Sequence, residues 1–260
     1  QKMTKRTIQI ALLLALSLIT FGCQSHSVQM TSGKKYLSGY TQVDMKEQNR
    51  SSIDQEVRFV AQIEPSLRFP ARIGLVKLYN GKISNLSAKE IESWTKVKEE
   101  MGEKFGDFVP VSSMIAEMVY SSQNINTKSN RNSVEIFRKV RLGAARQHLD
   151  HVLIYEVFSE TKTTKLASSV ANWTIIGGYF VPSREIETTG FANALLLDVR
   201  NGYPYGSASA SLNAKEFSAS QTYRDKSRNL ADKNQISTVI KLIPEVQQMM
   251  KKLIKESKQA

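Results

Sequence analysis

Residues 191–212 read FANALLLDVRNGYPYGSASASL, two extended stretches joined by Asn201-Gly202. Asn-Gly supplies the two positive φ angles of a type I′ turn at little energetic cost, so the pattern predicts a β-hairpin. The second stretch alternates serines with small residues at 206, 208 and 210, which would let a helix approach that face closely. The hairpin therefore predicts a sheet with a helix packed against it.

A helix that fits this face is expected near the C-terminal end of the sequence. From Ile236 to Leu253 apolar residues recur in steps of three and four, across Pro244, where we expect the helix to kink or restart. The other side of this helix carries lysines, most of them in the last turns, where the helix dipole favours cations. A basic amphipathic helix also suits a membrane surface. Docking on the hairpin is the favoured interpretation, because the hairpin otherwise lacks a cover.

Strands and helices alternate before the hairpin. We expect four strands, over residues 57–63, 72–79, 108–114 and 151–158. One helix is expected after Ser87, which forms a capping-box pattern with Glu90, and another after Asn132. The order of elements predicts an α+β fold, with a mixed β-sheet of about five to six strands flanked by two to three helices.

Residues 3–23 read MTKRTIQIALLLALSLITFGC. Basic residues precede an apolar run that is shorter than the ~20 residues of a spanning helix, which is typical of a signal peptide. The stretch resembles the lipobox of bacterial lipoproteins, in which a small residue, here Gly22, stands before the lipid-bearing cysteine, here Cys23. It departs from the usual pattern at Thr20 and Phe21. We expect residues 1–22 to be a lipoprotein signal peptide and Cys23 to carry the lipid anchor, palmitate included. The alternative is an ordinary signal in which Cys23 is incidental.

The residues after the signal are polar and lack a sustained period. We therefore expect residues 23–56 to be a flexible tether and residues 57–260 to form a single α+β domain. Cys23 is the only cysteine of the chain, so an acylated, exported protein would have neither a disulfide nor a thiolate metal site.

The formal net charge is +12, and residues 1–22 contain three basic residues and no acid, which leaves 12 − 3 = +9 after processing. A basic exported protein is attracted to anionic lipid headgroups, lipopolysaccharide or peptidoglycan. The export signal excludes nucleic acid as a partner. A solubilising surface would explain the same charge.

Chemistry-bearing residues cluster only at His148-Leu-Asp150-His151. Two imidazoles and a carboxylate could bind zinc or copper. However, His148 should end a helix and His151 should begin a strand, so we expect their side chains not to converge and predict no metal and no cofactor. Two Ser-x-x-Lys matches, at Ser93 and Ser159, lie in unrelated contexts. Without a phosphate loop or nucleophile elbow, the sequence predicts that the chain is not an enzyme.

Residues 159–189 are longer than a connection in a compact domain requires. Their centre is apolar and aromatic around Gly177-Gly178. We expect a hairpin that folds over its own sheet or presents Trp173, Tyr179 and Phe180 to a partner. Insertion into a membrane as part of a pore is the alternative.

The order of elements from residue 72 to residue 212 is similar to that of the curli-secretion channel subunit, the lipoprotein activators of penicillin-binding proteins and the amino-terminal domain of TolB. The resemblance rests on FVPV at residues 108–111, on the strand over residues 152–158 and on LLLDVRNG at residues 195–202. It implies a TolB N-terminal-like fold without a catalytic motif.

This resemblance and the lipobox together imply a periplasmic lipoprotein. Because Gln24 follows the cysteine, where the inner-membrane retention signal of gram-negative lipoproteins starts with Asp, the resemblance implies an anchor in the outer membrane. We expect a non-enzymatic accessory or binding component of an envelope assembly, with an envelope protein as partner. The alternative is a subunit of an oligomeric secretion pore like the curli channel.

Overall fold

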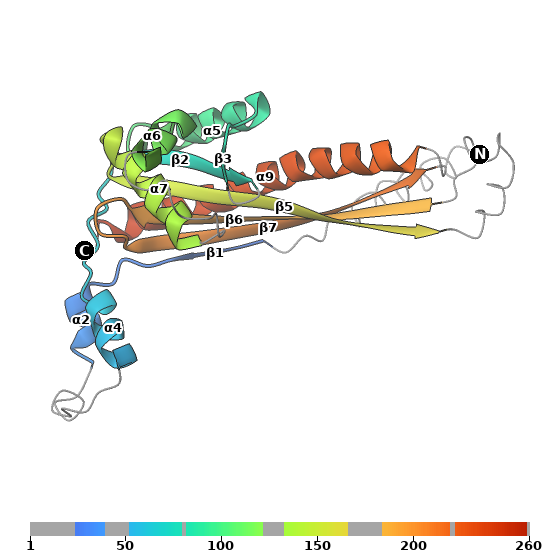
Figure 1. Ribbon diagram of the computed structural model, residues 1–260. Coiled ribbons are helices and arrows are strands. Elements are labelled where there is room, and N and C mark those ends of the chain that lie inside the picture. The colour runs from blue at the N-terminus through green and yellow to red at the C-terminus, as the bar shows by residue number, and fades with distance from the viewer. Residues whose placement is uncertain are drawn as a thin grey trace, which may run out of the picture. The chain divides into compact units, whose positions relative to one another are not determined.

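The structure is a computed structural model that describes residues 24–39, 52–79, 82–121, 133–165, 184–218 and 222–258. These residues form a seven-stranded mixed sheet of order β1-β7-β6-β5-β2-β3, with β4 also paired to β2 (Figure 1). The predicted α+β class with a mixed sheet is confirmed. The described residues contain more strands than predicted, and six helices in place of two to three.

The chain is divided into two compact units. The larger unit comprises residues 26–156, 193–208 and 243–260, and the smaller unit comprises residues 1–25, 157–192 and 209–242. Five of the described elements contribute residues to both units: β1 (Gln24–Val28), β5 (His151–Lys165), β6 (Arg184–Asp198), β7 (Pro204–Ser218) and α9 (Tyr223–Glu256). That residues 57–260 form a single domain stays a prediction.

Strand β2 (Ala71–Tyr79) lies at the centre of the larger unit. It pairs in parallel with β5 and with β4 (Gly106–Pro110), and antiparallel with β3 (Lys82–Ser84). Successive side chains of a strand point to opposite faces, and both faces of β2 are apolar and buried, with Leu75 on one and Val76 on the other. A strand of this composition needs a cover on each side.

Helices supply both covers. On one face, Val140 and Ala144 of α7 (Ser133–Arg146) join the apolar cluster around Val76. On the other face, Trp94 of α5 (Ala88–Met101) lies 5.8 Å from the ring of Tyr155 on β5. Helix α6 (Ser113–Ser121) packs on α7 and occupies residues 113 and 114, where the sequence predicts the end of a strand.

The predicted capping box of α5 is confirmed. The Ser87 hydroxyl accepts from the Glu90 amide, and the Glu90 carboxylate accepts from the Ser87 amide at 2.7 Å. Glu90 is fully buried, and the Lys77 ammonium lies 2.9 Å from it. Burial raises the pKa of Tyr155 well above its usual value, and the charge of Glu90 raises it further. The cap therefore also ties α5 to the sheet.

The hairpin of β6 and β7 forms where the sequence predicts it, but the predicted type I′ turn is wrong. Only Gly202 in the turn has a positive φ, +77°. The Asp198 carboxylate accepts from the amides of Arg200, at 2.8 Å, and Asn201, at 3.1 Å. This cap holds Asn201 at negative φ, and the turn spans residues 199–203.

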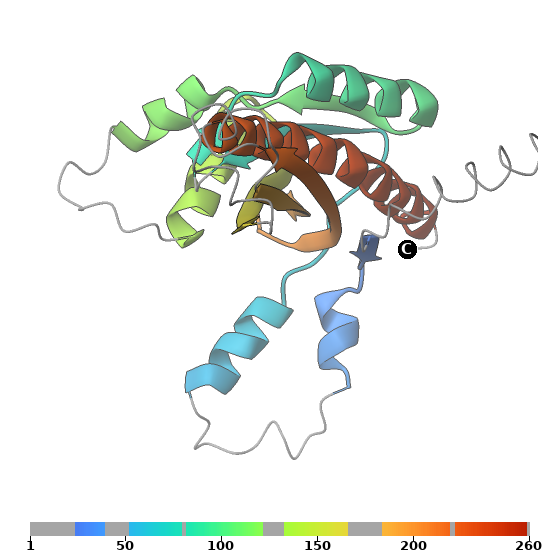
Figure 2. The ribbon, with the colours of Figure 1, turned by 90° about the vertical axis from the view of Figure 1, so that its right-hand side faces the viewer.

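Helix α9 starts well before the predicted Ile236 and continues through Pro244 without a restart. In the larger unit it approaches β7 closely, as predicted, because an added Cβ at Gly206 would lie only 2.9 Å from Met249 Sδ (Figure 2). The buried side of this part of α9 includes Val246 and Leu253.

The smaller unit has its own close approach between α9 and the sheet. An added Cβ at Gly190 of β6 would lie 2.0 Å from the side-chain oxygen of Asn234. The Asn234 amide donates to the carbonyls of Thr188, at 3.0 Å, and Leu212, at 3.1 Å. A buried amide thus bridges β6 and β7.

Two described segments, residues 24–39 and 52–61, differ from the prediction. Within the predicted tether lie β1 (Gln24–Val28), α2 (Gly33–Leu37) and the start of α4 (Ser52–Ala61), and α4 replaces the predicted strand over residues 57–63. In the larger unit, the Ser27 hydroxyl of β1 lies 2.9 Å from that of Ser207 on β7. An edge strand can form its backbone hydrogen bonds without large apolar side chains. The polar composition of residues 24–28 is therefore compatible with a strand.

None of the helices in the described ranges is long and apolar enough to cross a membrane. The signal peptide, Cys23 and residues 166–183 lie outside the described residues. The predictions made for Cys23, Trp173, Tyr179 and Phe180 therefore stay predictions.

Candidate functional site

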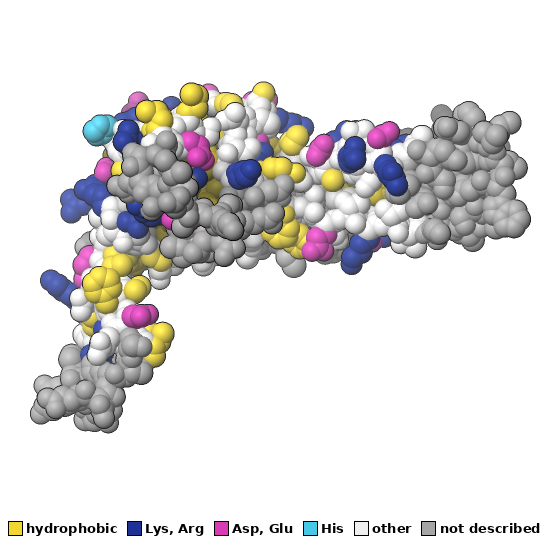
Figure 3. Space-filling model, viewed as in Figure 1, with side chains coloured by type: hydrophobic (Ala, Val, Ile, Leu, Met, Phe, Trp, Pro, Cys, Tyr) yellow, Lys and Arg dark blue, Asp and Glu magenta, His cyan; other side chains and the backbone are white. Residues whose placement is uncertain are grey.

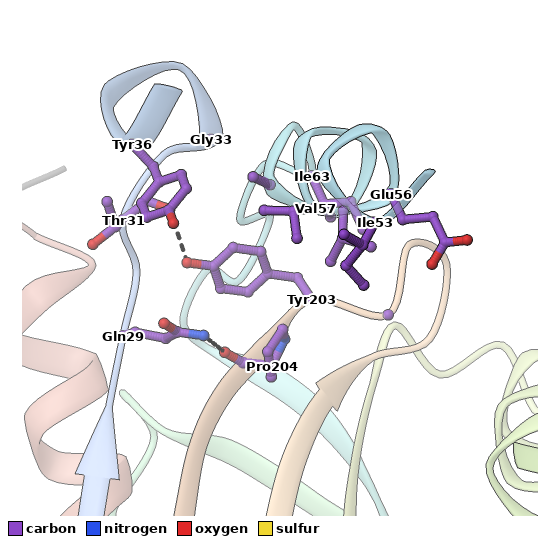
Figure 4. Close-up of a pocket in the computed structure, with 13 residues that line it drawn as sticks. Gln29, Thr31, Gly33, Tyr36, Ile53, Glu56, Val57, Ile63, Tyr203 and Pro204 are labelled. Atoms are coloured by element: carbon purple, nitrogen blue, oxygen red, sulfur yellow. Dashed lines mark hydrogen bonds between the residues drawn. The ribbon is translucent and has the colours of Figure 1, made fainter. Parts of the chain in front are cut away.

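An open apolar groove lies in the larger unit between α2, α4 and the turn of the β6–β7 hairpin. Its volume is about 500 Å³ (Figure 4). Most of the side chains that form its walls and floor are apolar: Tyr36, Ile53, Val57, Val60, Tyr203 and Pro204. A mostly apolar cavity of this size, with a few polar groups, is typical of a binding site.

Tyr203 forms the floor of the groove and is held in place. Its hydroxyl donates to the carbonyl of Thr31 at 2.8 Å. The Gln29 side chain donates to the carbonyl of Pro204 at 2.7 Å, and the Gln29 amide donates to the carbonyl of Tyr205 at 2.8 Å. Burial raises the pKa of Tyr203, and the charges of Glu64 and Glu256 raise it further. The floor is neutral at physiological pH and fixed to the sheet.

The two helices meet at Gly33. An added Cβ there would lie 2.3 Å from the carbonyl oxygen of Ala61, so only glycine permits this approach. The Glu64 carboxylate accepts from the amide of Lys34 at 3.0 Å, and this hydrogen bond lowers the pKa of Glu64. Backbone contact and this hydrogen bond thus hold α2 against the end of α4.

The wall formed by α4 is unfilled. Ile53, Val57 and Val60, spaced by four and three residues on one side of the helix, remain 59%, 43% and 62% exposed. Apolar side chains appear on the surface of this helix pair (Figure 3). Because about half of each side chain is still open to water, a ligand that covered them would gain about 1 kcal/mol at each. The wall therefore offers binding energy that the fold does not use.

A buried carboxylate fastens the groove to the sheet. Asp198 is fully buried, and it accepts from the Ser66 hydroxyl and, at 3.1 Å, from the Tyr205 hydroxyl. Tyr205 in turn accepts from the amides of Ser66, at 2.8 Å, and Leu67, at 2.9 Å. Burial works to raise the pKa of Asp198, but its hydrogen bonds outweigh burial and hold the pKa below its usual value. The segment between α4 and β2 is thereby clamped to the hairpin turn.

His151 lies beside this clamp. Its Nε2 is 3.6 Å from the Asp198 carboxylate, and among the described residues neither ring nitrogen has a hydrogen-bond partner. Burial lowers the pKa of His151, although Asp198 and Asp150 partly oppose the shift. Serine, histidine and aspartate recur in catalytic triads, but here Ser66 donates directly to the carboxylate and has no imidazole to take its proton. This connectivity is that of a structural clamp.

The side chains of His148, Asp150 and His151 lie in different surroundings. His148 is exposed at the end of the α7 turn with a φ of 54°, His151 is buried, and Asp150 pairs with Arg200. Within the described ranges, no group of three His, Cys, Asp or Glu side chains is placed to hold a metal ion. The expected separation of His148 from His151 is confirmed.

No protein-family model matches the chain, and no curated protein matches it. The chain is similar to the solved structure of the PelC dodecamer from Paraburkholderia phytofirmans, with 10% identity, 88% of this chain and 97% of that chain covered, and a TM-score of 0.33. Lipoprotein GNA1162 from Neisseria meningitidis has 18% identity, coverage of 63% and 97%, and a TM-score of 0.27. The hypothetical protein CT253 from Chlamydia trachomatis has 12% identity, coverage of 69% and 97%, and a TM-score of 0.27.

These TM-scores are too low to carry a conclusion about this chain. The resemblance to the curli channel subunit, the penicillin-binding-protein activators and TolB stays a prediction.

Sequence reasoning missed the groove. Its α4 wall could have been found from the helical spacing of Ile53, Val57 and Val60, but residues 57–63 also alternate as a strand does. No local sequence pattern predicts the clamp, because Ser66 lies far along the chain from Asp198 and Tyr205.

Proposed function

We propose that this chain is a lipid-anchored, non-enzymatic binding component of a bacterial outer-membrane assembly that faces the periplasm. Its partner is an envelope protein that docks an amphipathic helix in the groove between α2 and α4. The lipobox-like stretch before Cys23 supports the anchor, and the groove supports the binding role.

The open apolar wall of α4 carries this proposal. Helix-in-groove recognition needs an apolar channel, a rigid floor and apolar anchors spaced by three and four residues. Tyr203 provides the floor through its hydrogen bond to Thr31. Ile53, Val57 and Val60 provide the wall. A helix with the same spacing on its own apolar side would fill the space and exclude water.

The path from the anchor favours a groove near the bilayer. Strand β1 starts at Gln24, directly after Cys23, and Gln29 already lines the groove. Six extended residues span about 20 Å. The groove could therefore reach a partner in the same membrane or on its surface. A long flexible tether would not have fixed the distance between the groove and the membrane.

The pore alternative rests on residues 166–183, which lie outside the described residues. Trp173, Tyr179 and Phe180 remain a second proposed contact for the partner, and it does not depend on the groove. Among the described residues, no observation favours a pore.

Paired substitutions on α4 test the proposal. Val57→Asp and Val60→Asp place a carboxylate in the wall and should abolish recovery of the partner with the full-length, membrane-anchored protein. Phe59→Asp is the matched control, because Phe59 is 74% exposed on the same helix but does not line the groove. All three variants should keep the thermal melting profile of the parent. Equal recovery of the partner with Val60→Asp and Phe59→Asp would reject the groove as the binding site.

A further inference from the structure

The C-terminal part of α9 has two different sides. One side is buried against the sheet in the larger unit and includes Val246, Met250 and Leu253. The other side carries the exposed lysines Lys251, Lys252 and Lys255, and the exposed Lys258 follows two residues after the end of the helix. None of the ion pairs formed within the described ranges involves these lysines. The predicted docking of the helix on the sheet thus leaves its basic side free.

Helical geometry gathers the lysines on one side. At about 100° per residue, the directions of the three lysines within α9 fall within a sector of roughly 100°, opposite the buried residues. The one acidic residue in this stretch, Glu256, is half-buried, and its charge reaches Tyr203, whose pKa it raises. Among the described residues, Glu256 forms no ion pair with these lysines.

Strand β1 lies along the same part of α9. His26 Nδ1 of β1 is 2.8 Å from the Glu245 carboxylate of α9. Gly206 of β7 faces both the carbonyl of Ser27 and the side chain of Met249. Figure 1 places the C-terminal end of α9 beside the end of β1 that leads to α2. Lys252 follows Glu245 by two helical turns, on the flank that meets β1.

Helix α9 and β1 run in the same direction here, so the lysines lie toward the end of β1 that leads to α2. Cys23 precedes His26 by three residues, at most about 10 Å of chain. From Glu245 the lysines lie a further ~9–20 Å along the chain, at about 1.5 Å per residue, in the direction away from Cys23. The lysines therefore lie at most about 30 Å from a lipid at Cys23, a distance that one flat bilayer surface covers.

We infer that the exposed lysines of α9 contact the anionic phospholipid headgroups of the membrane in which the protein is anchored. The anchor is part of the proposed function, but the lysine contact can be tested without it. Each lysine close to an anionic surface strengthens binding on the order of fivefold, and salt screens this attraction. The contact fixes which side of the larger unit faces the bilayer.

Vesicle co-sedimentation of the unlipidated chain tests this inference. Residues 23–260 carrying Cys23→Ser should bind vesicles that contain phosphatidylglycerol and should not bind vesicles of phosphatidylcholine alone. Binding should fall steeply between about 0.05 and 0.5 M salt. Lys→Glu at the four lysine positions should weaken binding more than tenfold, and Lys→Gln at the same positions should give an intermediate loss.

The control reverses the same amount of charge elsewhere. Four other exposed basic residues of the larger unit, none in an ion pair with a described residue, are Arg72, Lys82, Lys89 and Arg146. Their replacement by Glu should weaken binding less than threefold. Equal losses in the two sets would mean that net charge alone drives binding and would overturn the inference. So would a parent chain that ignores anionic vesicles, or one that sediments with peptidoglycan instead.

Discussion

The Asp198 carboxylate connects the groove to the sheet through its hydrogen bonds. Its replacement should therefore destabilise both the groove and the hairpin turn. The carboxylate accepts from two hydroxyls, those of Ser66 and Tyr205, and from the amides of Arg200 and Asn201. Hydrogen bonds to a charged, buried acceptor contribute about 1.5–3 kcal/mol each but are not additive. We predict that Asp198→Ala lowers the free energy of unfolding by about 3–5 kcal/mol.

Asp198→Asn is the graded comparison. It keeps one oxygen for the two amides but turns an N–H group toward the hydroxyls of Ser66 and Tyr205. Tyr205 already accepts two backbone N–H donors, so it cannot accept a third. The expected loss is about half that of Asp198→Ala.

Urea denaturation of the Cys23→Ser chain at pH 7, followed by tryptophan fluorescence and far-ultraviolet circular dichroism, measures both losses. An Asp198→Ala variant within about 1 kcal/mol of the parent would refute the clamp.

The same clamp predicts a pH dependence. The pKa of Asp198 is held below its usual value of 3.8, so its contribution is complete above about pH 4 and is lost as the pH falls through the lowered pKa. The pKa of His151 is also lowered, from 6.5, so neutral His151 favours folding above pH 6.5 and this stabilisation declines at lower pH. The parent should lose stability from about pH 6.5 downward. His151→Phe should not lose stability between about pH 6.5 and 4, because this part of the loss comes from protonation of His151.

Three further predictions concern other parts of the chain. Gly202→Val should destabilise the protein by about 1–3 kcal/mol, because a β-branched residue resists the φ of +77° and meets the Arg141 guanidinium at 3.3 Å; an unchanged melting temperature would contradict this. Gly190→Ala should cost about 1–3 kcal/mol, since the added Cβ would lie 2.0 Å from Asn234 Oδ1, and amide exchange in the smaller unit should accelerate. Cys23→Ser should release the protein from membranes after a high-salt wash; complete retention would argue against attachment by lipid.

The elements that the sequence predicted well are those with local, redundant signals. Helix α5 has a capping box and an apolar stripe, and both are present in the fold. The β6–β7 hairpin has an Asn-Gly pair between extended runs, so its position is right. Its turn type is wrong because the capping carboxylate of Asp198 decides the backbone angles, and a propensity for Asn-Gly does not include that contact.

The groove depends on contacts that no local pattern encodes. In residues 57–63 the apolar positions fit both the two-residue repeat of a strand and the repeat of a helix. The segment is helical because it continues a helix that begins at Ser52. Strand β1 is polar, and it forms by pairing with β7, far away in the sequence. Ser66, Asp198 and Tyr205 meet only after the sheet is built, so their joint role has no sequence spacing.

The most direct test of the central claim, that the groove between α2 and α4 binds the partner, is photocrosslinking in intact cells. A benzophenone amino acid placed at Val60, in the wall, should yield one discrete protein adduct. The same group at Phe59, on the same helix but outside the groove, should yield little, and Val57→Asp should remove the Val60 adduct. Equal adducts from positions 59 and 60, or a Val60 adduct that survives Val57→Asp, would contradict the account.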